Sequence, residues 1–353
     1  MLQDTWKTRL FRYAHLQAYG QPARQAALSQ SSRTILGRTL RKRKDMTRST
    51  QWIHKLQGEA RPNELMARHT SLRVGGPADW YLLPAGLDDL RLILRHRENR
   101  PLFILGEGSN LLVSDKGIRG LVISLKRGFK QVGAPEFFQN DAGEACARLR
   151  AGAGVKMSYL VKYAARYGLA GMEDLVGVPG SLGGALVMNA GADGTEIGPL
   201  VHSLTVLTPE GELKTWDRGQ LRFEYRRTVF PESGGIIVSA ELVLKRGDRM
   251  AIQDRIDRHL KRRSQKQPLS LPNSGSVFKN PPGDTAGRLI EAAGLKGYRV
   301  GDAAVSIKHA NFIVNQGAAT AADVRAVIEH VRKTVKEHSG VDLEPEIVIA
   351  GEW

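Results

Sequence analysis

The sequence contains very little cysteine: Cys146 is the only one among 353 residues. A single cysteine cannot form an intramolecular disulfide, and a cysteine-based zinc site needs several thiolates. The sequence also lacks a run of about 18 apolar residues, which a transmembrane helix requires, and its N-terminus lacks the apolar core of a secretory signal. These absences predict a cytoplasmic protein in a reducing compartment, with no metal site and no membrane span.

Acidic residues are scarce in the first 48 positions. This segment contains 11 Lys and Arg side chains against Asp4 and Asp45, so it accounts for +9 of the net charge of +16. Because its hydrophobic periodicity is weak, we expect residues 1–48 to form a basic, poorly ordered extension. Three interpretations stay open: a partner-binding arm, a targeting peptide, or a leader translated ahead of a start at Met46. Its aromatic residues are few and no binding module is recognisable, so nucleic acid is not the expected partner.

The rest of the chain has an ordinary globular composition, and its length predicts two or three domains. From residue 70 onward, apolar runs of strand length alternate with glycine-rich turns, as at 102–105, 111–113 and 121–125. Helical spacing follows at residues 157–164 and stops at Gly168. This mixture predicts an α+β fold.

Two longer helices are expected in the C-terminal third. Ile252, Ile256 and Leu260 mark the apolar side of a basic helix, and we expect its Lys- and Arg-rich end, residues 261–266, to face solvent. The second helix, residues 320–339, has a stripe of Val and Ile, a threonine cap and a glycine stop. The chain is then expected to end in a strand over residues 345–350.

Two glycine-rich loops are candidates for binding a nucleotide. Residues 106–110 (Gly-Glu-Gly-Ser-Asn) lie between two expected strands, where glycines let backbone N–H groups converge on an anion. The spacing is not the Rossmann fingerprint, and a plain hairpin turn explains it equally well. Residues 177–192 are denser in small residues, and Pro179 and Ser181 suit the start of a short helix that would add to anion binding. For this second loop, a tightly packed crossover is the alternative.

Six segments, in order, resemble the UDP-N-acetylenolpyruvoylglucosamine reductase family. Residues 70–79, 106–110 and 178–192 resemble the successive FAD-binding segments of the family. Three later motifs of the family are similar to residues 223–228, 274–281 and 343–347. The resemblance covers about residues 50–353. One departure is Thr228, where the family more often has serine.

The resemblance implies an α+β fold with an FAD-binding domain of the vanillyl-alcohol oxidase type and a smaller α/β substrate-binding domain. We expect an FAD-binding region of two lobes over residues 49–247 and a substrate-binding domain over 248–340. Residues 341–353 would form a strand that returns to the FAD-binding region with a catalytic glutamate. The family binds FAD non-covalently and uses NADPH as co-substrate. The residues implied as FAD contacts are Arg73, Gly75, Gly106, Gly108, Ser109, Asn110, Pro179, Gly180, Ser181, Gly183, Gly184 and Asn189.

The family reduces UDP-N-acetylglucosamine-enolpyruvate to UDP-N-acetylmuramate in peptidoglycan precursor synthesis. NADPH reduces FAD, and reduced flavin delivers hydride to C3 of the enol ether, which leaves negative charge at C2. Arg226 matches the catalytic arginine, whose guanidinium can hold the adjacent carboxylate through two hydrogen bonds. Ser276 matches the proton donor to C2, a role that a serine hydroxyl can fill only in a dry pocket. Glu346 matches the third catalytic residue, although Glu344 faces the same side of the expected strand.

Other expectations concern the surroundings of this site. Tyr225, Lys279 and Asn280 are implied as contacts for the diphosphate or sugar of the substrate, and Ser274 is the local competitor of Ser276. His309 is expected to support the structure rather than bind a metal, since no second ligand has the required spacing. The alternative function is a flavoprotein oxidase of the same FAD-domain class that acts on a sugar alcohol or lactone. We expect a monomer.

Overall fold

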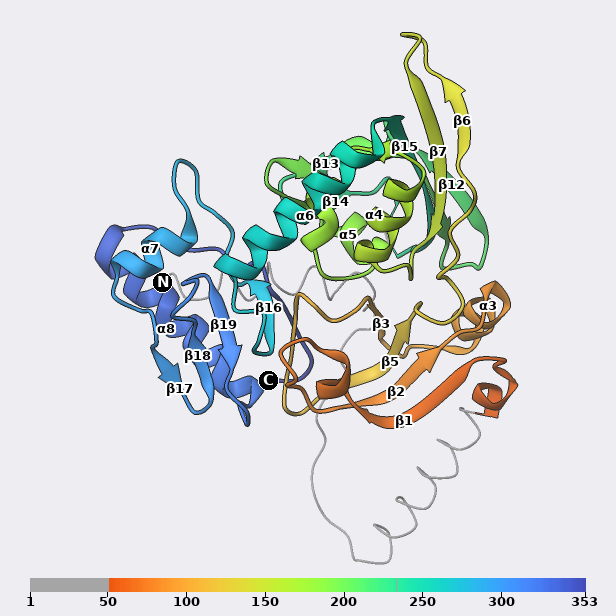
Figure 1. Cartoon of the computed structure of the whole chain (residues 1–353). Coiled ribbons are helices and arrows are strands. Elements are labelled where there is room, and N and C mark those ends of the chain that lie inside the picture. Colours follow the sequence, from red (N-terminus) through yellow and green to blue (C-terminus); the bar gives the residue numbers. More distant parts are fainter. Residues whose placement is uncertain (1–50, 233) are drawn as a thin grey trace, which may run out of the picture.

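The computed structural model describes residues 51–232 and 234–353. The extension expected over residues 1–48 lies outside the described residues. Three parts follow one another along the chain, each built on its own sheet (Figure 1). None of the described helices is long and apolar enough to cross a membrane.

The first lobe is a four-stranded sheet in the order β1-β2-β5-β3. β2 and β3 both run parallel to β5, and β1 is antiparallel to β2. Side chains alternate between the two faces of these strands: Leu82 and Leu121 pack in one core with helix α3, and Tyr81 and Val122 pack in another. The elements of this lobe are η1 (Gln51–Lys55), β1 (Glu59–Leu65), η2 (Met66–His69), β2 (Pro77–Leu83), α3 (Leu87–His96), β3 (Leu102–Leu105), β4 (Leu111–Val113) and β5 (Ile118–Ser124).

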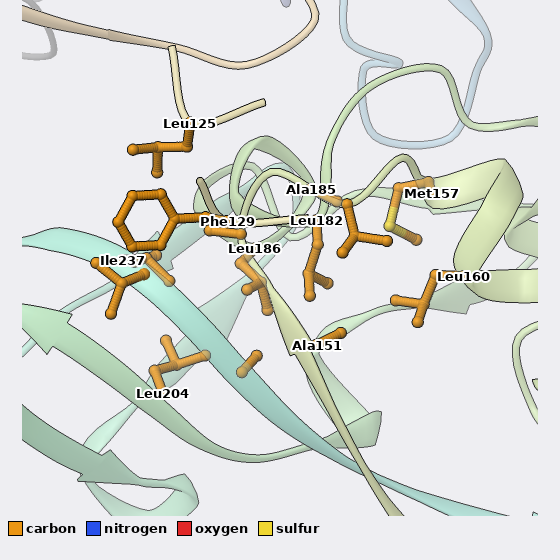
Figure 2. Close-up of a cluster of buried hydrophobic side chains, with 14 of the residues drawn as sticks. Leu125, Phe129, Ala151, Met157, Leu160, Leu182, Ala185, Leu186, Leu204 and Ile237 are labelled. Carbon is orange, nitrogen blue, oxygen red and sulfur yellow. The ribbon is translucent and has the colours of Figure 1, made fainter. Parts of the chain in front are cut away.

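The second lobe is an antiparallel sheet in the order β12-β11-β15-β7-β6, covered by helices on one face. Figure 2 shows Met157 and Leu160 of α4 and Leu182 and Leu186 of α5 lying over this sheet. The strands of this lobe are β6 (Glu136–Gln139), β7 (Ala145–Gly152), β8 (Leu169–Ala170), β9 (Gly191–Ala192), β10 (Thr195–Glu196), β11 (Val201–Leu207), β12 (Leu213–Asp217), β13 (Arg222–Glu224), β14 (Arg227–Val229) and β15 (Ile236–Arg246). Its helices are α4 (Met157–Arg166), η3 (Glu173–Gly177), α5 (Leu182–Val187), η4 (Gly198–Leu200), η5 (Arg218–Gln220) and α6 (Arg249–Lys266).

The C-terminal part is a four-stranded sheet, β16-β19-β18-β17, that packs against two helices. Helix α8 has the predicted cap, because the Thr320 hydroxyl accepts a hydrogen bond from the backbone N–H of Asp323, and Gly340 ends it at φ +74°. The elements are β16 (Asn273–Ser276), α7 (Ala286–Ala292), β17 (Arg299–Val300), β18 (Ala303–Val305), β19 (Phe312–Asn315), α8 (Ala321–Ser339) and β20 (Val348–Ala350). β20 pairs in parallel with β4, so the end of the chain returns to the first lobe.

The cores place the joint between the parts later than residue 248. Ile252 and Ile256 of α6 are buried in the core of the second lobe, so this helix packs mainly with that lobe. In return, Leu72 and Leu112 from the first lobe are fully buried in the core of the C-terminal part. The parts are therefore joined by shared apolar packing as well as by single chain connections.

Candidate active site

A cavity of about 1220 Å³ opens where the three parts meet. Its wall comes from the β3–β4 loop, the loop between η3 and α5, the β13–β14 hairpin, the last turns of α6, strand β16 and the segment before β20. Small-molecule sites usually measure roughly 300–1,000 Å³. The space is therefore sufficient for a large cofactor together with part of a substrate.

The β3–β4 loop contributes glycines, which have no side chain, to the cavity wall. Gly108 has φ +64°, and a Cβ there would collide with the carbonyl oxygen of His69. The Ser109 hydroxyl donates to the carbonyl of Pro179 (3.1 Å), which ties this loop to the second glycine-rich loop. Asn110 extends in the other direction, because its side-chain amide donates to the carbonyl of Glu346 (3.0 Å). The loop thus links the two lobes and the C-terminal segment around one space.

The second glycine-rich loop forms the adjoining part of the wall. Ser181 accepts a hydrogen bond from the backbone N–H of Gly184 (3.4 Å) and so begins the short helix predicted at this position, α5. Gly183 lies against the first strands of the lobe, where a Cβ would approach that of Ala153 to 3.0 Å. Pro179, Gly180, Ser181, Gly183 and Gly184 all line the cavity.

Arg226 and Glu346 meet at the cavity wall although 120 residues separate them. Arg226 is in the turn of the β13–β14 hairpin at φ +57°, and its Nε donates to Oε1 of Glu346 over 2.7 Å. Both side chains are largely buried, with 20% and 16% exposure. Burial raises the pKa of the Glu346 carboxyl, against the opposing effects of Arg226 and Lys279. This glutamate therefore retains a proton to a higher pH than an ordinary one.

Ser276 ends strand β16 and lines the same cavity. The ladder between β16 and β19 is irregular between Asn273 and Ser276, and Gly275 has φ +75° within that irregularity. Ser274 also lines the cavity, and its buried hydroxyl has no hydrogen-bond partner among the described residues. The structure thus brings Arg226, Ser276 and Glu346 to one cavity and keeps Ser274 there as well.

Comparisons with known proteins match two regions of the chain, one in the two N-terminal lobes and one in the C-terminal part. Residues 78–217 match a family model described as an FAD binding domain, and residues 267–350 match the C-terminal domain of UDP-N-acetylenolpyruvoylglucosamine reductase. The reductase of Alkalilimnicola ehrlichii is 47% identical over 297 residues, which are 84% of this chain and 96% of the relative. UDP-N-acetylenolpyruvoylglucosamine reductase 2 of Symbiobacterium thermophilum is 45% identical over 83% of this chain and 93% of its own. The chain belongs to the UDP-N-acetylenolpyruvoylglucosamine reductase family.

The fold agrees with this assignment. The crystal structure of the reductase from Thermus caldophilus superposes with a TM-score of 0.70 at 34% identity, covering 84% of this chain and 100% of that one. The predicted α+β class, with an FAD-binding domain and a smaller C-terminal domain, is confirmed. As a member of the reductase family with a matched FAD-binding domain, the chain is an FAD-dependent oxidoreductase.

The cavity is suitable for FAD because two adjoining loops without bulky side chains line it. Two other predicted FAD contacts of the reductase lie outside the cavity wall. Arg73 is exposed at φ +57°, and Gly75, at φ +125°, packs its backbone against the Val113 side chain. As cofactor contacts both stay predictions.

Asn189 has a structural position that the sequence did not reveal. Its side chain is fully buried and donates to Oε2 of Glu196 (2.6 Å) and to the carbonyl of Glu224 (3.0 Å). Its amide oxygen accepts from the backbone N–H of Gly198 (3.0 Å). Both amide donors are therefore used within the protein, where they support the hairpin that carries Arg226. As an FAD contact, Asn189 stays a prediction.

The expected equivalence of Glu344 and Glu346 is wrong. Residues 344–347 are not part of a strand, which begins only at Val348, so alternation does not apply to them. Glu344 is exposed and pairs with Lys279 at 2.7 Å, whereas Glu346 is in the cavity wall. Of the predicted substrate contacts, Asn280 lines the cavity and also accepts from the backbone N–H of Ala286 (3.1 Å).

Tyr225, the remaining predicted contact, is half exposed. Its ring stacks on the Arg226 guanidinium at 4.8 Å and is not part of the cavity wall. Thr228, the departure from the family pattern, keeps the function of a hydroxyl, because it donates to the carbonyl of Leu186 over 2.5 Å.

The basic end of α6 adjoins the cavity, and Arg262, Arg263 and Lys266 all contribute to the wall. Lys261, Arg262 and Lys266 are exposed to solvent, as expected, and of these basic residues only Arg263 is partly buried. Burial lowers the pKa of the Arg263 guanidinium, whose Nε donates to Oε1 of Gln267 (2.7 Å). Arg263 passes close to the second glycine-rich loop, where a Cβ on Gly177 would lie 2.9 Å from its Cδ. The spacing of these basic residues, three and four apart, places them on one helical face and could have indicated this arrangement.

Sequence reasoning also missed three polar residues of the wall, Asp174, Asp193 and His259. No simple spacing connects them, because they come from three separate elements. Within residues 51–232 and 234–353, no group of three or more His, Cys, Asp or Glu side chains could hold a metal ion.

Proposed function

We propose that this chain catalyses the NADPH-dependent reduction of UDP-N-acetylglucosamine-enolpyruvate to UDP-N-acetylmuramate, in peptidoglycan precursor synthesis. The observation that carries the proposal is the shared cavity: Arg226, Ser276 and Glu346, from three distant segments, line one space together with the two glycine-rich loops. Family membership supports the same reaction, since the relatives bear this enzyme's name.

FAD, bound non-covalently, would take a hydride from NADPH and pass it to C3 of the enol ether. The backbone of residues 106–110 and 179–184 would hold its diphosphate and let the ring approach closely. The protein then has two tasks: to stabilise the negative charge that develops at C2 and to supply a proton there.

Arg226 would carry out the first task. Of its N–H groups, Nε is bonded to Glu346, which leaves the two terminal nitrogens for the carboxylate of the substrate. The contact with Glu346 fixes the plane of the guanidinium before substrate arrives. Removing a preorganised contact of this kind costs about 2–4 kcal/mol of barrier.

Ser276 would donate the proton to C2, and Glu346 would assist. A serine hydroxyl is a weak acid, so it needs a strongly basic acceptor in a site shielded from water. The raised pKa of Glu346 suits a carboxyl that holds a proton near the hydroxyl or the developing enolate. Lys279 and Asn280, with Tyr225 at the rim, would contact the diphosphate or sugar of the substrate.

The test is to supply UDP-N-acetylglucosamine-enolpyruvate and NADPH to the purified, flavin-containing protein and to follow NADPH absorbance. We expect oxidation of NADPH that requires the UDP substrate. If bound flavin is reduced by a sugar alcohol or lactone instead, and no substrate-dependent NADPH oxidation occurs, the chain is an oxidase and the proposal is wrong. The same assay with NADH in place of NADPH measures the preference between the two.

A further inference from the structure

Helix α6 is held against the second lobe by a buried carboxylate. The side chain of Asp174, in η3, is only 3% exposed. Its two oxygens accept from Nε and Nη2 of Arg255 at 2.9 and 2.8 Å, and Oδ2 also accepts from the Thr195 hydroxyl (2.6 Å). Burial would raise the pKa of Asp174, but the bonds from Arg255 and Thr195 outweigh it and keep the pKa below its ordinary value. Asp174 is thus a firmly ionised anchor for α6.

One turn further along α6, His259 connects this anchor to a second carboxylate. Its Nε2 lies 2.5 Å from Oδ1 of Asp174, and its Nδ1 lies 2.9 Å from Oδ2 of Asp193. Asp193 is in the turn between β9 and β10, at φ +54°, and it also pairs with Arg262. Both ring nitrogens of His259 are therefore in contact with carboxylates, one on each side of the ring. The third and fourth turns of α6 are therefore clamped from two sides.

The clamp adjoins the basic end of α6. Arg263 follows directly and faces the glycine-rich loop that η3 leads into, since η3 ends at Gly177. Among the described residues, no carboxylate lies within ion-pair distance of Arg263 or Lys266, and both line the cavity. A partly buried guanidinium without an acidic partner is suited to a phosphate group, which accepts parallel hydrogen bonds from it. Helix and loop thus approach each other at a part of the cavity wall that carries positive charge.

We propose that Asp174 and Asp193, acting through His259 and Arg262, are positioning residues that hold the basic end of α6 at the correct distance from the second glycine-rich loop for binding a diphosphate. This inference rests on the proposed function, in which both FAD and the UDP substrate carry that group. In this role the carboxylates act through the helix, which presents Arg263 and Lys266 to the ligand.

The experiment uses the full-length holoenzyme with Asp193→Asn. Asparagine tolerates a positive φ and keeps the shape of the turn, so this variant removes the charge with little risk to folding. Asp257→Asn is the matched control, because Asp257 is an exposed carboxylate of the same helix that does not line the cavity. Asp174→Asn is a second variant, with its melting temperature recorded beside the others. The measurements are kcat, KM for the UDP substrate, and separate dissociation constants for UDP and, after flavin removal, for FAD.

We expect Asp193→Asn to weaken binding of a diphosphate ligand by roughly 10- to 100-fold, with kcat near that of Asp257→Asn. A weaker affinity for UDP alone assigns the site to the substrate, and a weaker affinity for FAD alone assigns it to the cofactor. Affinities for both that match the control, or a loss of kcat with unchanged KM, would overturn the proposal. If the parent enzyme fails to reduce the substrate, the proposed function is wrong, but the two binding measurements still test the clamp because they need no turnover.

Discussion

Arg226 occupies a backbone conformation that few arginines adopt. At φ +57° it is one of six described non-glycine residues with positive φ, and such a conformation costs on the order of 1–3 kcal/mol unless its surroundings impose it. Here they do: the paired strands β13 and β14 leave a two-residue turn, and Asn189 holds the carbonyl of Glu224 at its start. In this conformation the Arg226 guanidinium lies at the cavity wall, where its Nε donates a hydrogen bond to Glu346.

Ser276 is the residue at which the two half-reactions should separate. Changing Ser276 to Ala removes the proposed proton donor but leaves the flavin-binding loops untouched, so reduction of flavin by NADPH should proceed normally. Reoxidation by the UDP substrate should slow by roughly 10²–10⁴-fold, the range for a lost general acid. Rapid-mixing measurements of flavin absorbance follow each step separately.

Ser274→Ala is the control for this variant, since Ser274 lies two residues away in the same cavity wall. It should leave both half-reactions near the parent rates. Equal damage to both half-reactions in Ser276→Ala, or the larger effect in Ser274→Ala, would remove Ser276 from its role.

Glu346 should make stability fall as the pH rises. Its pKa in the folded protein lies above the ordinary 4.5, so the folded state binds the proton more tightly than the unfolded chain. That contribution is fully present below about pH 4.5 and is lost as the pH rises through the raised pKa. In Glu346→Gln, which cannot titrate, the decrease of the urea midpoint from about pH 5 to pH 8 should be smaller than in the parent.

Glu344→Gln is the comparison for this experiment, because Glu344 is exposed and pairs with Lys279. Its midpoints should follow those of the parent protein. The opposite result is a urea midpoint of the parent that rises from about pH 5 to pH 8 relative to that of Glu346→Gln. It would show that the ion pair with Arg226 lowers the pKa of Glu346 by more than burial raises it.

At the scale of elements, the N-terminus of α8 joins the C-terminal part to the first lobe. Asp115, in the turn after β4, accepts from the backbone N–H groups of Ala321 and Ala322 at 2.8 and 2.9 Å. Thr320 and Asp323 add a capping box. The Thr320 hydroxyl accepts from the backbone N–H of Asp323, and the Asp323 carboxylate accepts from the backbone N–H of Thr320. The position of this helix therefore depends on two carboxylates and one hydroxyl.

Thr320→Ala should destabilise α8 by about 1 kcal/mol, within the range of roughly 0.5–2 kcal/mol for a lost cap. Thr320→Ser retains the hydroxyl and should keep most of that stability. Thermal unfolding measures the difference, and faster hydrogen exchange confined to the first turn of α8 locates it. No difference between the alanine and serine variants would mean that Asp115 alone stabilises this helix end.

At the scale of the whole molecule, catalysis should depend only on residues described by the structure. All proposed catalytic residues and the matched family regions lie within 78–350. Deleting residues 1–48 should therefore leave kcat/KM for the UDP substrate within about twofold of the parent, and the purified protein should remain yellow from bound flavin. Loss of catalysis, with flavin retained, would show that the basic extension takes part in the reaction.

The sequence determined the local features of this protein. Glycine-rich loops, the cap and stop of α8 and the apolar stripes of α4 and α8 depend on residues close together in the chain, so spacing alone predicts them. Six ordered motifs also indicated the family, since each preserves a loop of defined backbone shape. Three of these motifs contain Arg226, Ser276 and Glu346.

Only the tertiary structure decided which of these residues meet. The apolar spacing of α6 predicts a helix, but only the burial of Ile252 and Ile256 against the second lobe places Arg263 beside the cavity. A continuous strand over residues 345–350 would put Glu344 and Glu346 on one face, but the irregular backbone before β20 separates them. No sequence pattern shows that the side chain of Asn189 supports the hairpin that carries Arg226. The reason is the same in each case: the direction of a side chain depends on packing between segments far apart in the chain, which a local pattern does not contain.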